Sequence, residues 1–533
     1  MPAREHAGGG QVVVDAPQQR SPDREPLSTS SVRPSRLTGW LRDPLAIALI
    51  ACIAVAGLSA AVLPTVPSYD PWSWIVWGRE VFNPHLSFTV GGGPSWKPLP
   101  VMFAGVFGLF GGAAPTLWMI TARAGGLLGL VGAWRLAARL TDSFIDRPSR
   151  TAARLAPSIA GLVAVLGVLG TQDWFYYWFR GTSEPMLIAT AVWAVDRFLD
   201  GKRGQAFVFA ALGGLIRPEW WPFLAVYGLW LWFKEPRLRP LILVGWVANP
   251  FFWFVPPWIG TGQPFIAAAH AREYNGHLGN HPELEALRRA ADLQVLPVLI
   301  AAAVAVLWTW LRERDRTVLA LAAGALSWIV LVVVMVADGY PGLERFFLPA
   351  SAILCVLGGL GFARVAMVVG GRLAALASAS GGGALPWLAG ACAGLLAAVL
   401  IAISIPFASS RIDDARAAKP TADQAVRILN QLFDAVKAVG GHDAVFPCKS
   451  SVVAVNHGVQ TPLAWPLRVT LERVRTALHG PGLDFIGPHN SVDGGPAPVS
   501  AKLTVHQQIA QVGVWRVVRV LAPGDPANAC VGR

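Results

Sequence analysis

The sequence predicts a mainly α-helical, polytopic membrane protein: a bundle of about eleven transmembrane helices with interfacial helices, followed by a small C-terminal exported α/β domain. Three observations predict this class. Hydrophobic residues make up 54% of the 533 residues and charged residues only 14%, which is more apolar surface than a soluble core can hide. Apolar runs of spanning length recur from residue 44 to residue 406. The net charge of +12 comes mainly from basic residues between these runs, as the positive-inside rule expects of a membrane protein.

The chain begins with a polar segment. Residues 1–43 are rich in Pro, Ser, Gln and Arg and have no apolar periodicity, so we expect a disordered tail on the cytoplasmic side. The first apolar run, residues 44–63, is long enough to span and lies too far from the start for a typical cleaved signal peptide. It is interpreted as an uncleaved first span.

Further apolar runs predict the rest of a transmembrane domain over residues 44–408. Ten runs of spanning or near-spanning length follow the first, at residues 115–138, 154–171, 185–199, 204–218, 219–233, 240–258, 293–311, 317–337, 346–369 and 385–406. The segment 98–112 has only about fifteen apolar residues, fewer than the roughly twenty that cross a bilayer core. If it crossed, the Arg-rich connections between later spans would face outward, against the positive-inside rule. We therefore expect a re-entrant or interfacial helix there.

An odd number of spans with a cytoplasmic N-terminus places residues 409–533 outside the membrane. This domain has a helical pattern over residues 425–436 and strand-like runs at 444–446, 451–456 and 512–521. Cys448 and Cys530 are the only two of the five cysteines that lie in it. A disulfide between them fits an oxidising compartment, and two unrelated thiols are the alternative.

Asp70 is the first candidate for chemistry. It precedes Pro71 in the predicted outward loop 64–98. One interpretation is structural, because Asp is a good N-cap and Pro suits the first helical position. The other is catalytic, because a carboxylate at the end of the first span, beside a space between helices, can deprotonate an acceptor hydroxyl.

Lys97 stands at the start of the segment 98–112. The chain has only seven lysines among its 44 basic residues, and Lys97 is the only one expected on the outward side of the transmembrane domain. A compact ammonium there can hold a lipid phosphate or pyrophosphate as a point charge. The alternative is an ordinary lysine whose stem lies in the interface.

Further ionisable residues lie at the predicted outward ends of spans. Such groups are costly at membrane depth and usually pair or line a functional cavity. A local ion pair that caps a helix is the alternative for Arg217 and Glu219. The set comprises Arg123, Arg180, Glu184, Arg217, Glu219, Asp338, Glu344 and Arg345.

Motifs for other reaction classes are missing from the sequence. His270, His277 and His281 lie in one predicted outward loop, but no HExxH-like ligand pattern accompanies them, so we expect a solvated loop and no metal site. The sequence has no Walker motif, no GxGxxG after a strand and no GxSxG. This argues against a nucleotide-driven pump and a serine hydrolase.

Taken in order, these motifs resemble the GT-C superfamily of polyprenyl-phosphate-sugar-dependent glycosyltransferases. The resemblance covers roughly residues 44–410: an acidic residue in the first outward loop, a KPxLP-like motif, an Arg near the start of the second span, an LxRPE-like motif and an ERFFLP motif. The matching residues are Asp70, Lys97, Arg123, Arg217, Glu219 and Arg345. The first loop has one Asp in YDPW instead of the acidic pair of many members, and the lysine motif reads KPLP instead of KPPL. Glu80 is the candidate for the second carboxylate.

The resemblance implies a donor of the undecaprenyl- or decaprenyl-phosphate type. Lys97 and Arg345 are then expected to neutralise its phosphate, with Arg123, Arg217 and Glu219 lining the same site and Asp70 as the base of a single inverting displacement. Cations that stabilise a phosphate leaving group favour the transition state over the ground state. No cofactor is expected, and the resemblance leaves open whether the reaction uses a divalent cation.

The sequence thus predicts a multi-pass plasma-membrane glycosyltransferase that acts on an extracytoplasmic glycan, lipid or protein of the cell envelope. A high-Arg, Ala-rich chain of actinobacterial style suits arabinofuranose or mannose donors for cell-wall synthesis, which is an association from composition. The first alternative is a lipid or solute transporter or flippase, although no internal repeat of the transporter kind is found. The second is a non-catalytic envelope scaffold, which predicts that Asp70 and Lys97 are replaceable. No nucleic-acid partner is expected.

Overall fold

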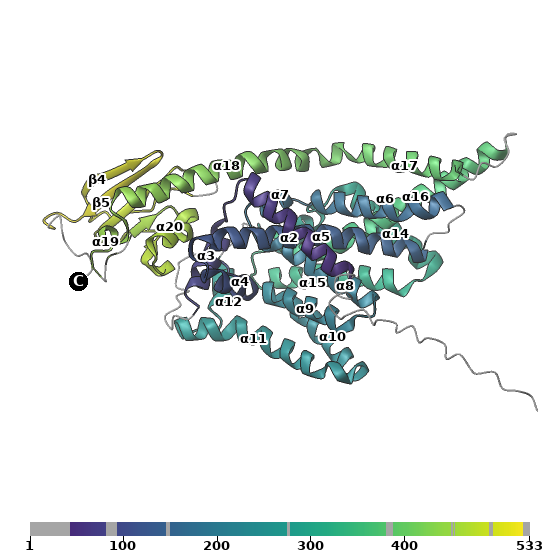
Figure 1. Ribbon diagram of the computed structural model, residues 1–533, viewed down its shortest axis with the longest axis horizontal. Helices are drawn as coiled ribbons and strands as arrows, with labels where there is room; N and C mark the ends of the chain where they lie inside the picture. The colour runs from purple at the N-terminus through teal and green to yellow at the C-terminus, as the bar shows by residue number, and fades with distance from the viewer. Residues whose placement is uncertain are drawn as a thin grey trace, which may run out of the picture. The chain divides into compact units, whose positions relative to one another are not determined.

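The computed structural model describes residues 43–81, 93–144, 150–273, 278–379, 387–448, 451, 453–489 and 494–525. The described residues from Ala48 onward form one compact unit. The chain is mainly helical up to residue 445, and a small sheet follows (Figure 1). The predicted tail, residues 1–43, lies outside the described residues except for Asp43.

Helices make up the first part of the chain. They are α2 (Pro44–Val62), α3 (Tyr69–Arg79), α4 (Pro98–Gly108), α5 (Ala114–Phe144), α6 (Arg150–Leu169), α7 (Trp174–Phe179), α8 (Glu184–Leu199), α9 (Arg203–Ile216), α10 (Trp221–Lys234), α11 (Arg239–Thr261), α12 (Ile266–Glu273), α13 (Pro282–Asp292), α14 (Leu296–Trp308), α15 (Arg316–Ala337), α16 (Leu348–Ala379) and α17 (Leu388–Ser404). Short 3₁₀ turns join several of them, including η2 (Pro218–Trp220) and η5 (Glu344–Phe347), and a π turn, η4 (Thr309–Glu313), continues α14.

Six helices of the described residues are long and apolar enough to cross a membrane. The helix pair α17 and α18 (Ser409–Ala438) is bent by 44° and makes a seventh if it counts as one span. The predicted number of eleven spans is not confirmed. The predicted spans at 185–199, 204–218 and 219–233 form α8, α9 and α10, which have only 16, 14 and 14 residues. The predicted interfacial segment at 98–112 forms the short helix α4, of 11 residues.

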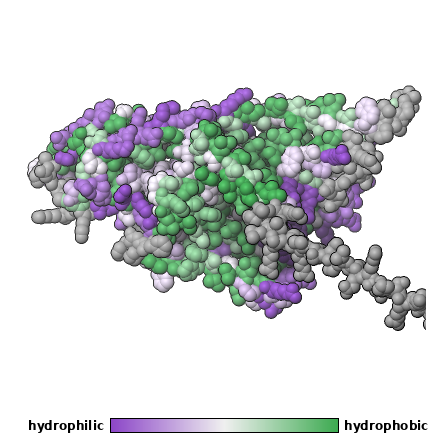
Figure 2. Space-filling model, viewed as in Figure 1, coloured by the Kyte–Doolittle hydropathy of each residue, from purple (hydrophilic) through white to green (hydrophobic). Residues whose placement is uncertain are grey.

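The long helix α16 packs at the centre of the bundle against α5, α6, α14, α15 and α17. Two of its glycines make close contacts possible: a Cβ added at Gly359 would collide with the carbonyl of Ala160 in α6, and one at Gly361 with the carbonyl of Ala301 in α14. Small residues at such crossings let helix backbones approach closely. Figure 2 shows hydrophobic side chains gathered over the bundle.

The C-terminal region, residues 409–525, combines helices with a five-stranded sheet. Its elements after α18 are α19 (Gly441–Val445), β1 (Val453–Val455), η7 (His457–Val459), α20 (Gln460–Leu467), β2 (Val474–Arg475), β3 (Gly482–Ile486), β4 (Val505–Val512) and β5 (Trp515–Leu521). The strand order is β2-β1-β3-β5-β4. β1 is parallel to both its neighbours, and β5 is antiparallel to β3 and β4. Hydrophilic side chains are prominent over this region (Figure 2).

Comparison with the expected elements of this region gives one correction. The helical pattern at 425–436 lies within α18, and β1 and β5 lie within two of the predicted strands. The strand predicted at 444–446 is wrong, because Ala444 and Val445 close the short helix α19. Gly440 and Gly441, both at positive φ, redirect the chain into this helix turn.

One continuous apolar core joins the C-terminal region to the bundle. It includes Trp72 and Trp77 of α3, Leu432 of α18, Leu463 of α20 and Phe485 of β3, all buried. The indole of Trp72 lies 6.1 Å from the ring of Phe433 and 6.2 Å from that of Trp465, centroid to centroid. The helix that carries Asp70 is therefore packed against the C-terminal region.

Candidate functional site

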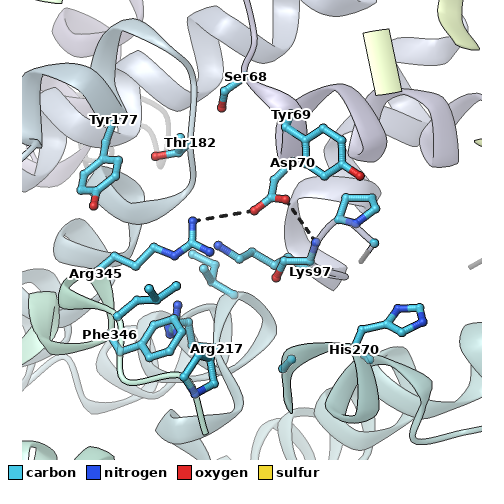
Figure 3. Close-up of a pocket in the computed structure, with 18 of the residues that line it drawn as sticks. Ser68, Tyr69, Asp70, Lys97, Tyr177, Thr182, Arg217, His270, Arg345 and Phe346 are labelled. Carbon is cyan, nitrogen blue, oxygen red and sulfur yellow. Dashed lines mark hydrogen bonds and ion pairs between the residues drawn. The ribbon is translucent and has the colours of Figure 1, made fainter. Parts of the chain in front are cut away.

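A cavity of about 610 Å³ lies at the first turn of α3. Figure 3 shows Asp70, Lys97, Arg217 and Arg345 directed into it from different parts of the chain. Two lining residues, His457 and Gly458, come from the C-terminal region. The volume falls within the range of small-molecule sites.

Asp70 lies in the first turn of α3, and its carboxylate faces this cavity. Of the two interpretations of Asp70, the N-cap role is wrong, because the helix begins at Tyr69 and Ser68 holds the N-cap position. Oδ1 of Asp70 accepts a hydrogen bond of 3.2 Å from the backbone N–H of Ser95, and Oδ2 lies 3.9 Å from Nη1 of Arg345. A carboxylate accepts about four hydrogen bonds, so it has capacity left for a substrate group.

The loop before α4 is tied to α3 at two points. Besides the bond from Ser95 to Asp70, the indole N–H of Trp74 donates to the carbonyl of Ser95 at 2.8 Å. Trp74 is fully buried. Asp70 and Lys97 are thereby held on adjoining segments at one side of the cavity.

Lys97 is buried, and its ammonium already has protein partners. Nζ lies 2.9 Å from Oε1 of Glu184 and 2.8 Å from Oγ of Ser183. It also lies 5.2 Å from the ring centroid of Trp74, within cation–π range. The side chains of Lys97 and Glu184 are only 4% and 1% exposed, so each charge compensates the other where both are buried.

Arg217 and Arg345 approach the cavity from different elements. Arg217 follows α9, and its guanidinium lies 3.9 Å from the ring centroid of Phe346 and 3.1 Å from Oε1 of Glu219. The local ion pair that the alternative interpretation proposes for Arg217 and Glu219 is therefore present. Arg345 belongs to η5, and its Nε is buried without a hydrogen bond in the described part of the chain. Glu219 is buried behind Arg217 and does not line the cavity.

Arg123 and Glu80, like Glu184, Glu219 and Asp338, are sequence candidates that lie outside the cavity lining. Arg123 is fully buried, donates to Oγ of Ser59 and to the carbonyl of Pro64, and lies over the ring of Trp178. It therefore holds the end of α2. Glu80 follows the last residue of α3 and lies 2.8 Å from Arg79. Ten residues of helix separate it from Asp70 by about 15 Å, too far for both carboxylates to contact one reacting centre.

The other predicted groups are placed as follows. His270 lines the cavity, His281 lies 3.8 Å from Glu283, and His277 falls outside the described residues. The described residues contain no cluster of three or more His, Cys, Asp or Glu side chains arranged for a metal ion. Cys448 is disulfide-bonded, and Cys530 lies outside the described residues.

Several lining residues were not among the sequence candidates. Ser68, Tyr69 and Tyr177 come from segments around the motifs YDPW and FRGTSEP. Had whole segments been considered instead of their charged residues alone, these three would have been included. His457 has no such signal, because it belongs to no motif and reaches the site only through the docking of the C-terminal region.

The arrangement brings carboxylates together with several cations. The lining includes the cations Lys97, Arg180, Arg217 and Arg345 and the carboxylates Asp70, Glu273 and Glu344. Arginine guanidinium groups bind phosphate oxygens in a planar, often bidentate geometry. A carboxylate beside such cations can accept a proton while the cations stabilise a departing phosphate.

No protein-family model and no curated protein matches the sequence. Solved structures that resemble the chain include ArnT from Cupriavidus metallidurans bound to undecaprenyl phosphate and the same protein in the apo state. The first matches with a TM-score of 0.45 and 14% identity, over 90% of this chain and 98% of that one. The second matches with a TM-score of 0.44 and 14% identity, over 91% and 98%. Both TM-scores lie below 0.5.

Proposed function

We propose that the chain is an inverting membrane glycosyltransferase that moves a sugar from a polyprenyl-phosphate donor to an extracytoplasmic acceptor of the cell envelope. The observation that supports this most is the position of Asp70 in one cavity with Arg345, 3.9 Å away, and with Lys97 and Arg217. A base and a group of cations are the two requirements of a displacement in which phosphate leaves.

The proposed reaction is a single displacement. The acceptor hydroxyl oxygen attacks the anomeric carbon, its proton passes to the Asp70 carboxylate, and the bond from the anomeric carbon to the phosphate oxygen breaks. The electron pair of that bond stays on the phosphate. Arg345 and Arg217 stabilise the negative charge that grows there, which lowers the transition state more than the bound ground state.

The role proposed for Lys97 differs from that of Arg345 and Arg217. Its ammonium is compensated by Glu184 and shares the cavity wall with Asp70. We propose that the donor phosphate draws Lys97 into its own hydrogen bonds, with Glu184 and Ser183 fixing the position of the ammonium before the donor arrives. A preorganised cation needs little reorganisation when the charge develops.

The membrane supplies the donor in this proposal. A polyprenyl chain is apolar and can lie between the helices of the bundle, whereas a sugar nucleotide is not required on the outer side. The N-terminus is then cytoplasmic and the C-terminal region extracytoplasmic, as the positive-inside rule predicts.

The experiment uses purified full-length protein in liposomes with polyprenyl-phosphoryl mannose or decaprenyl-phosphoryl arabinofuranose. Octyl mannoside and octyl arabinofuranoside serve as acceptors, and mass spectrometry measures free polyprenyl phosphate and product. We expect release that depends on the protein, with an inverted anomeric linkage by NMR. Folded protein that releases no polyprenyl phosphate from any pair would contradict the proposal and would favour a transporter or a scaffold.

A further inference from the structure

The C-terminal region reaches into the cavity at one short element, η7. His457 begins η7 and lines the cavity together with Gly458. The cations Lys97, Arg217 and Arg345 all come from the bundle. The C-terminal region therefore adds to the cavity lining residues that lie outside the bundle.

The first turn of α3 is fastened to the helix that follows η7. Oγ1 of Thr461 donates to the carbonyl of Tyr69 at 2.7 Å, and the hydroxyl of Tyr69 donates to Oε1 of Gln460 at 3.1 Å. Thr461 and Gln460 are buried. Because Tyr69 directly precedes Asp70, these two bonds fix the distance between Asp70 and η7.

His457 is itself held on a rigid support. The preceding residue, Asn456, is fully buried, donates to the carbonyl of Pro488 at 2.9 Å and accepts from the N–H of Gly487 at 3.1 Å. The imidazole of His457 then lies against the ring of Tyr69, with centroids 5.0 Å apart. Its ring nitrogens make no hydrogen bond to any residue that the structure describes, although the side chain borders the cavity.

The surroundings favour the neutral form of this imidazole. Desolvation by the surrounding protein lowers the pKa of His457 below its usual value, and the negative charge of Asp70 opposes part of this shift. A neutral imidazole has one donor and one acceptor nitrogen, which suits a hydroxyl group. It adds no positive charge beside the base, so it does not compete with Arg345 for the donor phosphate.

We propose that His457 positions the acceptor: its imidazole binds one hydroxyl of a saccharide whose neighbouring hydroxyl lies against Asp70. This inference rests on the proposed transferase function. The attacking hydroxyl still gives its proton to Asp70, and His457 neither gains nor loses a proton in the step. A hydrophilic acceptor would enter along the C-terminal region, where hydrophilic side chains are prominent (Figure 2).

The test compares His457→Ala, His457→Asn and wild-type protein in the liposome assay, with varied concentrations of octyl mannoside or octyl arabinofuranoside. Loss of one substrate hydrogen bond predicts a KM for the acceptor about tenfold higher in His457→Ala, with the KM for the donor unchanged. His457→Asn keeps a donor and an acceptor atom, so it is expected to recover part of the acceptor affinity.

His479→Ala is the matched control, because His479 is an exposed histidine of the same region that does not line the cavity. It should behave as the wild type. Equal acceptor KM values for His457→Ala and His479→Ala, with release of polyprenyl phosphate intact, would overturn this inference and leave the transferase function standing. If the wild type releases no polyprenyl phosphate, the proposed function fails and the inference fails with it.

Discussion

At the scale of single residues, the site depends on which charges are already paired. Glu184 compensates Lys97, and Glu219 compensates Arg217. Arg345 differs, because its only ion pair within the described residues is with the carboxylate of Asp70, 3.9 Å away. Sequence motifs identified Asp70, Lys97, Arg217 and Arg345 because these residues belong to short patterns. They also selected Arg123 and Glu80, since a pattern does not show which way a side chain points.

The ion pair of Lys97 and Glu184 allows the structural role of Lys97 to be separated from its role in the reaction. Lys97→Met leaves Glu184 as a buried unpaired charge, so we expect a loss of about 3–5 kcal/mol in the free energy of unfolding. In Lys97→Met with Glu184→Gln, the stability should largely return, because no charge is left uncompensated.

Thermal unfolding in detergent measures the stability of these variants, and release of polyprenyl phosphate measures their activity. We expect the double variant to stay well below wild-type activity. Recovery of both properties would show that Lys97 serves the fold alone.

Asp484 gives a prediction about pH. It is buried in β3, its Oδ1 has no hydrogen bond in the described part of the chain, and burial raises its pKa to about 7, with His506 opposing the shift. Its folded-state pKa lies above the unfolded value of about 3.9. The folded state therefore holds a proton that the unfolded state has lost, and stability falls as pH rises from about 4 to 7.

Asp484→Asn removes this dependence. We expect stabilisation of the C-terminal region at pH 8, by at most about 4 kcal/mol, and little change at pH 4. Hydrogen exchange of the amides in β3 and β5, corrected for intrinsic rates, measures the effect in the full chain. An equal effect of the substitution at both pH values would contradict the account.

At the scale of elements, hydropathy predicted the positions of the helices well. It predicted less well which of these helices are long enough to cross a membrane. Runs such as 317–337 and 346–369 fall within α15 and α16, because a long apolar segment has few alternatives to a helix. The predicted spans at 204–218 and 219–233 became the short helices α9 and α10, separated by Arg217 and Pro218. The break that prevents one long helix there is also what places Arg217 in the cavity.

Substitutions of glycines in α16 test how closely the helices of the bundle pack. Gly361→Val should collide with the backbone of α14, because a Cβ at this position would meet the carbonyl of Ala301. We expect destabilisation of about 1–3 kcal/mol or more. Gly371→Val on the same helix is the control, since a Cβ there meets nothing within 4 Å.

Thermal melting in detergent compares the two glycine variants. We expect a clear drop in melting temperature for Gly361→Val only. Similar melting temperatures for both variants would mean that α16 and α14 do not approach as closely as described.

At the scale of the whole molecule, the docking of the C-terminal region on α3 could not be predicted from the sequence. Its residues follow the last predicted span and carry no motif, and the apolar core that they share with α3 arises only from the folded arrangement. Trp465 lies at this contact, beside Trp72 and with the guanidinium of Arg79 5.2 Å from its ring centroid.

Trp465→Ala removes a large side chain from this contact. Because Trp465 is partly buried, we expect destabilisation of at most about 3–5 kcal/mol, which loosens the C-terminal region and lowers the transfer rate while the donor still binds. Limited proteolysis measures the loosening, and the exposed Val514→Ala is the control. If transfer stays at the wild-type rate although the region is readily cleaved, the docked arrangement does not serve the reaction.

The central claim is that Asp70 is the base of a displacement that releases polyprenyl phosphate. The most direct measurement is the single-turnover rate of that release for Asp70→Asn and for Glu80→Gln, two carboxylates at opposite ends of α3. The account predicts a loss of about 10²–10⁴-fold for Asp70→Asn and a rate near the wild type for Glu80→Gln. A wild-type rate in Asp70→Asn, or a loss of this size in Glu80→Gln alone, would contradict it.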